Sequence, residues 1–201
     1  MHDRSALHQF FLSSNRISAS SAAEMAEVFH PYELKQDAYL LRSGDVSDTY
    51  LFLESGWMRG FAITPEGDEV TTGIFSPGNV VFEVSSFFLR VPSQENIQAL
   101  EDCRAWSVNF EELNGLFHSR AEFREFGRAI LVRGYASLKG RMLSMISLTA
   151  EQRYEALLRH HPEAFQHVPL KHIASYLGVT DSSLSRIRRE FARKSMAPAK
   201  G

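Results

Sequence analysis

The sequence predicts an α+β protein in which a β-rich segment lies between helical segments. Three observations predict it. Short apolar runs interrupted by glycines fill residues 32–110, a proline-free stretch with helical spacing follows over 110–146, and a small helical segment with a basic second helix occupies 149–201. We therefore expect three parts, comprising residues 1–115, 116–146 and 147–201.

The first half of the chain is predicted to change from helix to strand. Apolar residues at helical spacing predict helix over residues 5–30, and Pro31 ends the pattern. The runs that follow are short and evenly spaced, which is typical of a sandwich or a small barrel. The stretch TPEGDE at residues 64–69 predicts a hairpin turn in which Gly67 takes a positive φ. The interior of this unit is expected to comprise Leu40, Leu51, Leu53, Phe61, Ile63, Ile74, Phe75, Val81, Leu100 and Trp106.

Residues 110–146 are predicted to form one helix of roughly 30 residues, longer than a compact domain needs. Gly127 and Gly134 lie seven residues apart, and close approach of a partner backbone would explain both. An apolar stripe along the helix favours a coiled-coil-like seam, so we expect a homodimer through residues 116–146. The alternative is a helix packed only on its own barrel. The stripe comprises Phe123, Ile130, Leu131, Leu138, Met142 and Met145.

Residues 149–201 are predicted to form a small helical domain. Thr149 and Gln152 have the spacing of a capping box, and Pro162 ends the helix that follows. In LKHIASYLGVTDSSLSRIRREFARK, residues 170–194, two helices flank a corner at Gly178, which predicts a helix-turn-helix. The buried faces of the two helices are expected to comprise Leu170, Ile173, Ala174, Leu177, Leu184, Ile187 and Phe191.

The second of these helices is a candidate for reading DNA in the major groove. Arg186 can donate two hydrogen bonds to guanine O6 and N7, and Ser182 and Ser185 can bond a base or a phosphate. Neighbouring cations suit phosphates, including Lys194. The alternative is an ordinary helix corner with a solvated basic face. The predicted DNA-binding residues are Ser182, Ser185, Arg186, Arg189, Lys171, Thr180 and Arg188.

Charge is divided unequally along the chain. Residues 1–119 contain 7 Lys+Arg and 17 Asp+Glu, a balance of −10. Residues 120–201 contain 15 Lys+Arg and 7 Asp+Glu, a balance of +8. A basic C-terminal segment suits a polyanionic partner, and double-stranded DNA is the simplest one.

Residue content disfavours several other classes. A single cysteine, Cys103, excludes an intramolecular disulfide and a cysteine-ligated iron–sulfur cluster within one chain. Residues 32–110 contain no histidine, so we expect neither a cupin-type metal site nor an enzyme. No apolar run is long enough to cross a bilayer, and the N-terminus lacks the pattern of a secretion signal. A cytoplasmic protein that does not bind membranes is expected.

The order of these patterns resembles that of the Crp/Fnr regulators. The resemblance spans about residues 10–193 and implies a double-stranded β-helix or jelly roll of the cyclic-nucleotide-binding type, a long dimerisation helix and a C-terminal helix-turn-helix. It further implies a dimeric transcription regulator on a two-fold operator, with RNA polymerase as another candidate partner. The stretches that carry it are LLRSGD (40–45), YLFLESGWMRGF (50–61), PEGDE (65–69), SPGNVVFE (76–83) and IASYLGVTDSSLSRIRR (173–189).

The ligand site departs from the family pattern. Cyclic-nucleotide binders of this family carry a Gly-Glu pair at the ribose and an Arg-Ser/Thr pair at the cyclic phosphate. Here Phe82 and Glu83 replace the first pair, and no cation lies around Ser93 and Gln94. Cyclic AMP is therefore disfavoured, because its phosphate would lose charge-assisted hydrogen bonds and would be repelled by Glu95.

The sequence thus predicts a homodimeric DNA-binding transcription regulator that responds to a small effector other than cyclic AMP. The alternative is a sensor of the same type whose C-terminal domain binds a protein, and the exposed arginines of the second helix argue against it. The pocket is expected either to bind the effector or to be filled by Phe82, Phe87 and Phe88. Its candidate residues are Phe82, Glu83, Ser85, Ser86, Gln94 and Asn96.

Overall fold

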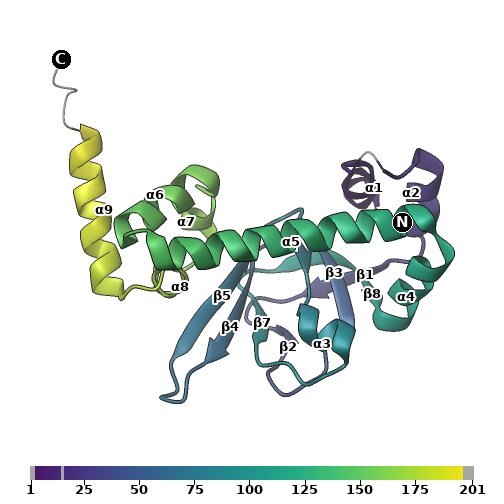
Figure 1. Ribbon diagram of the computed structural model, residues 1–201, viewed down its shortest axis with the longest axis horizontal. Helices are drawn as coiled ribbons and strands as arrows, with labels where there is room; N and C mark the ends of the chain where they lie inside the picture. Colours follow the sequence, from purple (N-terminus) through teal and green to yellow (C-terminus); the bar gives the residue numbers. More distant parts are fainter. Residues whose placement is uncertain (1–2, 15, 197–201) are drawn as a thin grey trace.

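The computed structural model describes residues 3–14 and 16–196. Figure 1 shows a β-roll beneath one long helix, with small helices at one end of it and a helical domain at the other. The helices are α1 (Ser5–Leu12), α2 (Ala19–Ala26), α3 (Val84–Leu89), α4 (Phe110–Ser119), α5 (Ala121–Ser147), α6 (Ala150–His160), α7 (Ala164–His167), α8 (Leu170–Tyr176) and α9 (Asp181–Met196). The strands are β1 (His30–Leu34), β2 (Tyr39–Leu41), β3 (Thr49–Ser55), β4 (Met58–Ile63), β5 (Glu69–Phe75), β6 (Val80–Val81), β7 (Asn96–Ala99) and β8 (Cys103–Asn109).

The β-roll, residues 30–109, consists of two four-stranded antiparallel sheets. Their strand orders are β1-β8-β3-β6 and β2-β7-β4-β5. The interior predicted from the sequence is confirmed at Leu51, Leu53, Phe61 and Val81, which are at most 1% exposed. The prediction was wrong for Ile63, which is 58% exposed because it pairs with Glu69 at the solvated tip of the β4–β5 hairpin.

A second core of aromatic side chains joins the N-terminal helices, the roll and α5. Phe10 on α1 stacks on Phe52 of β3 with ring centroids 4.5 Å apart. Phe11 lies edge-on to Phe126 of α5 at 5.4 Å, and Phe123 of the same helix is 1% exposed. Edge-to-face aromatic contacts of this kind stabilise a core beyond the area they bury. The first turns of α5 are therefore fixed to the roll.

Two of the predicted helices are interrupted. The helix expected over residues 5–30 is in fact α1 and α2, and strand β1 already begins at His30. The helix expected over residues 110–146 breaks at Arg120, whose φ of −125° and ψ of 108° are extended. Asn109 and Glu112 begin α4 with a reciprocal capping box, and the break then lets α4 fold back against α5.

The break explains Gly127 without a partner chain. A Cβ at Gly127 would lie 2.4 Å from Cε1 of Phe117 on α4, so only glycine lets the two helices approach this closely. The expectation that a partner backbone requires Gly127 was therefore wrong. A Cβ at Gly134 would have no neighbour within 4 Å in the described chain, so the structure explains Gly127 but not Gly134.

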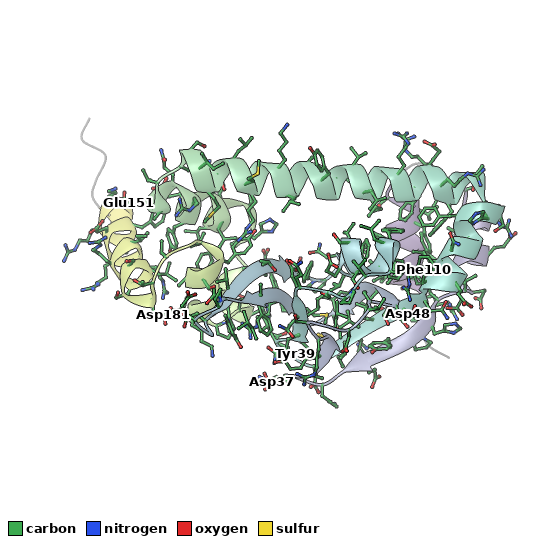
Figure 2. All side chains as sticks on the ribbon, turned by 60° about the horizontal axis from the view of Figure 1, so that its bottom comes forward. Asp37, Tyr39, Asp48, Phe110, Glu151 and Asp181 are labelled. Atoms are coloured by element: carbon green, nitrogen blue, oxygen red, sulfur yellow. The ribbon has the colours of Figure 1, made fainter. Side chains whose placement is uncertain are left out.

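The apolar stripe of α5 divides into a buried and an exposed part. Phe123 and Ile130 pack against the aromatic core of the same chain. The remaining members form the exposed part, and Figure 2 shows side chains of α5 that extend into solvent. Five apolar residues there repeat at alternating steps of four and three and are 39–68% exposed: Leu131, Tyr135, Leu138, Met142 and Met145.

We predict that Gly127→Ala lowers the free energy of unfolding, although alanine favours a helix by about 1 kcal/mol over glycine. The new methyl group would collide with the Phe117 ring at the α4–α5 crossing. Thermal or urea unfolding measures the effect. Gly115→Ala is the matched control: a Cβ there has no neighbour within 4 Å, so this variant should gain about 1 kcal/mol. Equal gains in both variants would contradict the packing role of Gly127.

Candidate functional site

The corner between α8 and α9 has the hydrogen bonds of a Schellman motif. Gly178 has a φ of +67°, a left-handed conformation that costs little only for glycine. Its N–H donates to the carbonyl of Ser175 at 3.0 Å, and the N–H of Val179 donates to that of Ala174 at 3.0 Å. This geometry ends α8 at Tyr176, and α9 starts at Asp181 after four intervening residues. The glycine corner between two helices is as the sequence predicts.

Thr180 caps the N-terminus of α9. Its Oγ1 accepts a hydrogen bond from the backbone N–H of Ser183 at 3.3 Å. The hydroxyl oxygens of Ser182 and Ser183 each lie 3.0 Å from the same atom. The N-cap satisfies backbone donors that the helix leaves unpaired, so it fixes the first turn of α9.

α9 has one buried face and one solvated face. Leu184 and Ile187 are buried against α6 and α8, and Phe191 packs at the edge of the same core. The opposite face carries Ser182, Arg186, Arg189 and Arg193, which are all exposed and follow i, i+4, i+7 and i+11 spacing. Figure 2 shows Asp181, the first residue of α9, and Glu151 of α6 at the end of the molecule remote from Phe110. We call these four residues the reading stripe.

The other predicted DNA-binding residues surround the reading stripe. Ser185 and Arg188 are exposed on α9, and Lys171 is exposed on α8. The ammonium group of Lys194 lies 3.8 Å from a carboxylate oxygen of Glu151 on α6, an exposed ion pair. A pair of this kind contributes little to stability, so it leaves Lys194 able to turn toward a phosphate.

The predicted buried face of the first helix is confirmed at Ile173, Ala174 and Leu177, which are at most 3% exposed, and was wrong at Leu170. Leu170 is 41% exposed, whereas His172, for which no role was predicted, is 8% exposed. Nδ1 of His172 lies 2.8 Å from Nη1 of Arg59, a strand residue that is 4% exposed. The signal available in the sequence was an arginine within the otherwise apolar strand MRGFAI, residues 58–63.

The predicted ligand residues of the roll mostly bond to one another or to nearby backbone. Both carboxylate oxygens of Glu83 cap α3, accepting from the N–H groups of Ser85 and Ser86 at 3.0 and 2.5 Å. The hydroxyl of Ser86 accepts from the N–H of Ser47, and Asn96 Oδ1 accepts from that of Ser43. Gln94 is exposed and lies apart from them.

Phenylalanines fill the space beside α3. Phe82 contacts Phe87 and Phe88 with ring centroids 5.5 and 5.8 Å apart, and Phe87 is fully buried. The ring centroid of Tyr50, a buried residue, lies 4.9 Å from that of Phe82. Aromatic rings therefore occupy the space directly beside α3.

Glu95 lies in the roll, and from the sequence its expected effect was only to repel the phosphate of cyclic AMP. Burial raises the pKa of Glu95, a hydrogen bond from Thr72 opposes this rise, and the nearby Glu83 carboxylate adds to it. The single Lys or Arg of residues 80–100 is Arg90. Its guanidinium donates instead to the carbonyl of Ser47 at 2.7 Å and to Asp48 at 2.8 Å.

Cys103 has no reactive environment. The thiol is buried, and burial raises its pKa to about 11. Since the thiolate is the reactive form, this side chain is inert near neutral pH. Among the described residues, no group of three or more His, Cys, Asp or Glu side chains could hold a metal ion. Within the same part of the chain, every helix is too short or too polar to cross a bilayer.

Comparisons with known proteins agree with this architecture. The family model of the cyclic nucleotide-binding domain matches residues 31–120, which cover the β-roll and α4. The transcriptional activator protein anr of Pseudomonas aeruginosa is 25% identical over 179 residues, covering 84% of this chain and 72% of that protein. The fumarate and nitrate reduction regulatory protein of Yersinia pestis is 26% identical over 173 residues, 81% of this chain and 68% of that protein.

Solved structures share the arrangement of most of the chain. FixK2 from Bradyrhizobium japonicum superposes with a TM-score of 0.73 at 15% identity, covering 87% of this chain and 89% of FixK2. The c-di-GMP-responsive global regulator CLP of Xanthomonas campestris gives 0.69 at 18% identity, covering 92% of this chain and 96% of CLP. With a β-roll, a long helix and a helix-turn-helix in this order, the chain is similar in sequence and in fold to the Crp/Fnr transcription regulators.

Proposed function

We propose that this protein is a cytoplasmic, homodimeric regulator that reads a two-fold DNA operator with α9 and responds to a small effector other than cyclic AMP. The reading stripe carries the proposal. It joins a hydroxyl and three guanidinium groups on one exposed face of a helix whose other face is buried. A helix held in this way can enter the major groove and present its N-terminal residues to the bases.

Within the reading stripe, position along α9 separates the roles. Arg186 lies in the second turn, within reach of base edges, where a guanidinium can donate two hydrogen bonds to one guanine. Arg193 and Lys194 lie in the last turns and suit the phosphate backbone, as does Lys171 on α8. Thr180 acts through the cap that fixes the first turn.

The exposed stripe of α5 supports the homodimer. Leu131, Leu138 and Met145 are spaced by seven residues, and so are Tyr135 and Met142. That is the a/d pattern of a two-stranded coiled coil, whose apolar seam is buried by a second copy of the helix. A two-fold seam would place the two copies of α9 about one helical turn of DNA apart, on the order of 34 Å.

The polar groups of the roll argue against a cyclic phosphate as effector. Glu83 and Glu95 lie close enough to raise the pKa of Glu95, so a bound anion would be repelled. Arg90 is engaged by Ser47 and Asp48. Arg141 lowers the pKa of Glu95 but does not cancel the rise, so it offsets the negative charge only in part. A neutral or cationic molecule fits this charge better. RNA polymerase remains a proposed further partner.

For Arg186→Ala we expect a loss of about 1–3 kcal/mol in binding at one operator position, with relaxed base preference there. Selection of duplex DNA from a random library at fixed physiological salt identifies the operator and tests the variant on it. Arg104→Ala, an exposed arginine of β8 remote from α9, is the control. A wild-type selection without an enriched palindrome, showing only weak salt-sensitive binding, would contradict sequence-specific reading.

Leu138→Asp should convert the dimer to a monomer, because a carboxylate at the seam would be buried without a partner. The apparent affinity for a two-half-site operator should fall on the order of a hundredfold, as expected when two linked contacts become independent. Sedimentation equilibrium gives the mass. Ala136→Asp places the same charge on an exposed side of α5 outside the stripe and should remain dimeric. A dimeric Leu138→Asp variant would place the seam elsewhere.

Cyclic AMP at millimolar concentration should change neither the affinity for the operator nor the melting temperature measurably. The physical reason is the negative charge of Glu83 and Glu95, which the nearby Arg141 offsets only in part, since the pKa of Glu95 stays raised. Fluorescence anisotropy of labelled operator and differential scanning fluorimetry measure the two quantities. A saturable rise in either would refute the proposed exclusion of a cyclic phosphate.

A further inference from the structure

The first helix of the helix-turn-helix lies along an open edge of the roll. Strand β5 is the outer strand of its sheet. The hydroxyl of Ser175 on α8 accepts from the N–H of Thr71 at 2.8 Å and donates to the carbonyl of Glu69 at 3.2 Å. Arg141 of α5 donates to the carbonyls of both Thr71 and Tyr176, at 3.2 and 3.1 Å. Side chains of α8 and α5 therefore satisfy the backbone of this strand edge.

A buried arginine lies at the centre of the same contact. The Arg59 guanidinium is paired with Glu69 of β5 at 2.7 Å and donates to Oε1 of Gln98 on β7 at 2.9 and 3.2 Å. Its third partner is Nδ1 of His172 on α8, at 2.8 Å. Because arginine has no acceptor and stays protonated, Nδ1 must accept, so His172 is neutral and carries its proton on Nε2.

Apolar contacts complete the interface. Trp57 and Leu100 of the roll belong to the same buried cluster as Ile173 and Leu177 of the helix-turn-helix. The Trp57 ring also stacks on His167 of α7, with centroids 5.2 Å apart and planes 10° apart. The roll and the reading domain thus share a core.

We propose that Arg59 and His172 form a latch that fixes the helix-turn-helix on the roll in its DNA-reading orientation, and that acid opens this latch. The latch rests on the proposed function, because it concerns how the effector domain controls DNA binding. The reading stripe stays exposed while the latch is closed, so the closed arrangement is competent to bind. Two-half-site binding requires both copies of α9 at a fixed spacing, and therefore requires both latches.

The latch also connects to the polar side of the roll. Gly60 follows Arg59 on β4, and a Cβ there would lie 3.1 Å from Oγ1 of Thr72 and 3.5 Å from Oε2 of Glu95. Arg59 and Gln98 are partners across β4 and β7. An effector that bound at Glu95 and moved these strands would therefore act one residue away from Arg59, and it would displace the acceptors of the Arg59 guanidinium.

The charges around His172 set the direction of the acid response. Burial, then Arg59 and Lys171, lower the pKa of His172 to about 4, while Glu69 and Asp181 act in the opposite direction. An exposed histidine has a pKa of about 6.5. The undocked domain therefore takes up a proton first, and docking weakens as the pH falls from 6.5 toward 4. From these two values, docking should be about tenfold weaker at pH 5.5 than at pH 7.5.

Another histidine lies at the same interface. Nδ1 of His167 on α7 lies 2.7 Å from a carboxylate oxygen of Glu101 in the roll. Variants of His172 are therefore needed to assign the response.

Trp57 supplies the readout. It is one of two tryptophans, and Trp106→Phe leaves it as the single emitter. In this parent protein, lowering the pH from 7.5 to 5.0 should shift the emission to the red and increase quenching by acrylamide. In the same background, His172→Lys should show the open signal already at pH 7.5, because it places a cation against Arg59. His160→Lys, an exposed position on α6, should behave as the parent.

His172→Asn keeps an acceptor near the position of Nδ1 but does not titrate. It should stay closed at pH 5.0, and it keeps the test informative if His172→Lys fails to fold by circular dichroism. A parent protein with pH-independent emission would overturn the acid response. A folded His172→Lys variant that emits like the parent would overturn the latch itself.

DNA binding separates the latch from the proposed function. On the selected operator at pH 7.5, His172→Lys should bind at least tenfold more weakly than the wild type, with a single half-site bound within twofold of it. Equal operator affinities would refute the latch while leaving DNA reading intact. Failure of the wild type to bind any duplex would refute the proposed function, and the Trp57 measurement would still decide whether the latch exists.

Discussion

The buried guanidinium of Arg59 determines how the two folded parts of this protein fit together. Once withdrawn from water, it must find acceptors for its N–H groups. Two of these acceptors, Glu69 on β5 and Gln98 on β7, lie on the two strands that flank β4, and the third belongs to His172 in the other domain. An apolar contact alone would tolerate sliding, whereas these hydrogen bonds are satisfied in one orientation only. The polar centre therefore supplies orientation, and Trp57 and Leu100 supply buried area.

The long helix α5 contacts the rest of the chain near both of its ends, and its side chains between them are largely exposed. Its first turns are fixed by the aromatic core around Phe123 and Phe126, and Gly127 brings α4 close against it. Near its other end Arg141 bonds to the backbone of both the roll and α8. One helix thus joins the roll to the helix-turn-helix, and the apolar stripe along it is exposed.

The sequence predicts those features that depend on local spacing. The order of the elements, the left-handed glycine at the helix corner and the Thr180 cap follow from patterns a few residues long. Sequence patterns do not predict the features that depend on contacts between residues distant in the chain. The break at Arg120, the need for Gly127 and the burial of His172 each depend on a neighbour that only the folded chain brings near. Ile63 was misplaced because strand alternation does not reveal where a hairpin leaves the core.

The edge of strand β5 gives the closed arrangement a protective role. Ser175 and Arg141 satisfy backbone groups of Glu69 and Thr71 that would otherwise face outward from the sheet. Withdrawal of the helix-turn-helix would bare these groups together with the apolar surface of Trp57 and Ile74. An uncovered strand edge beside apolar surface is a template for pairing with another chain. The helix-turn-helix domain therefore also shields the roll from edge-to-edge pairing with other chains. A regulator held open for long would be prone to aggregation and to proteolysis.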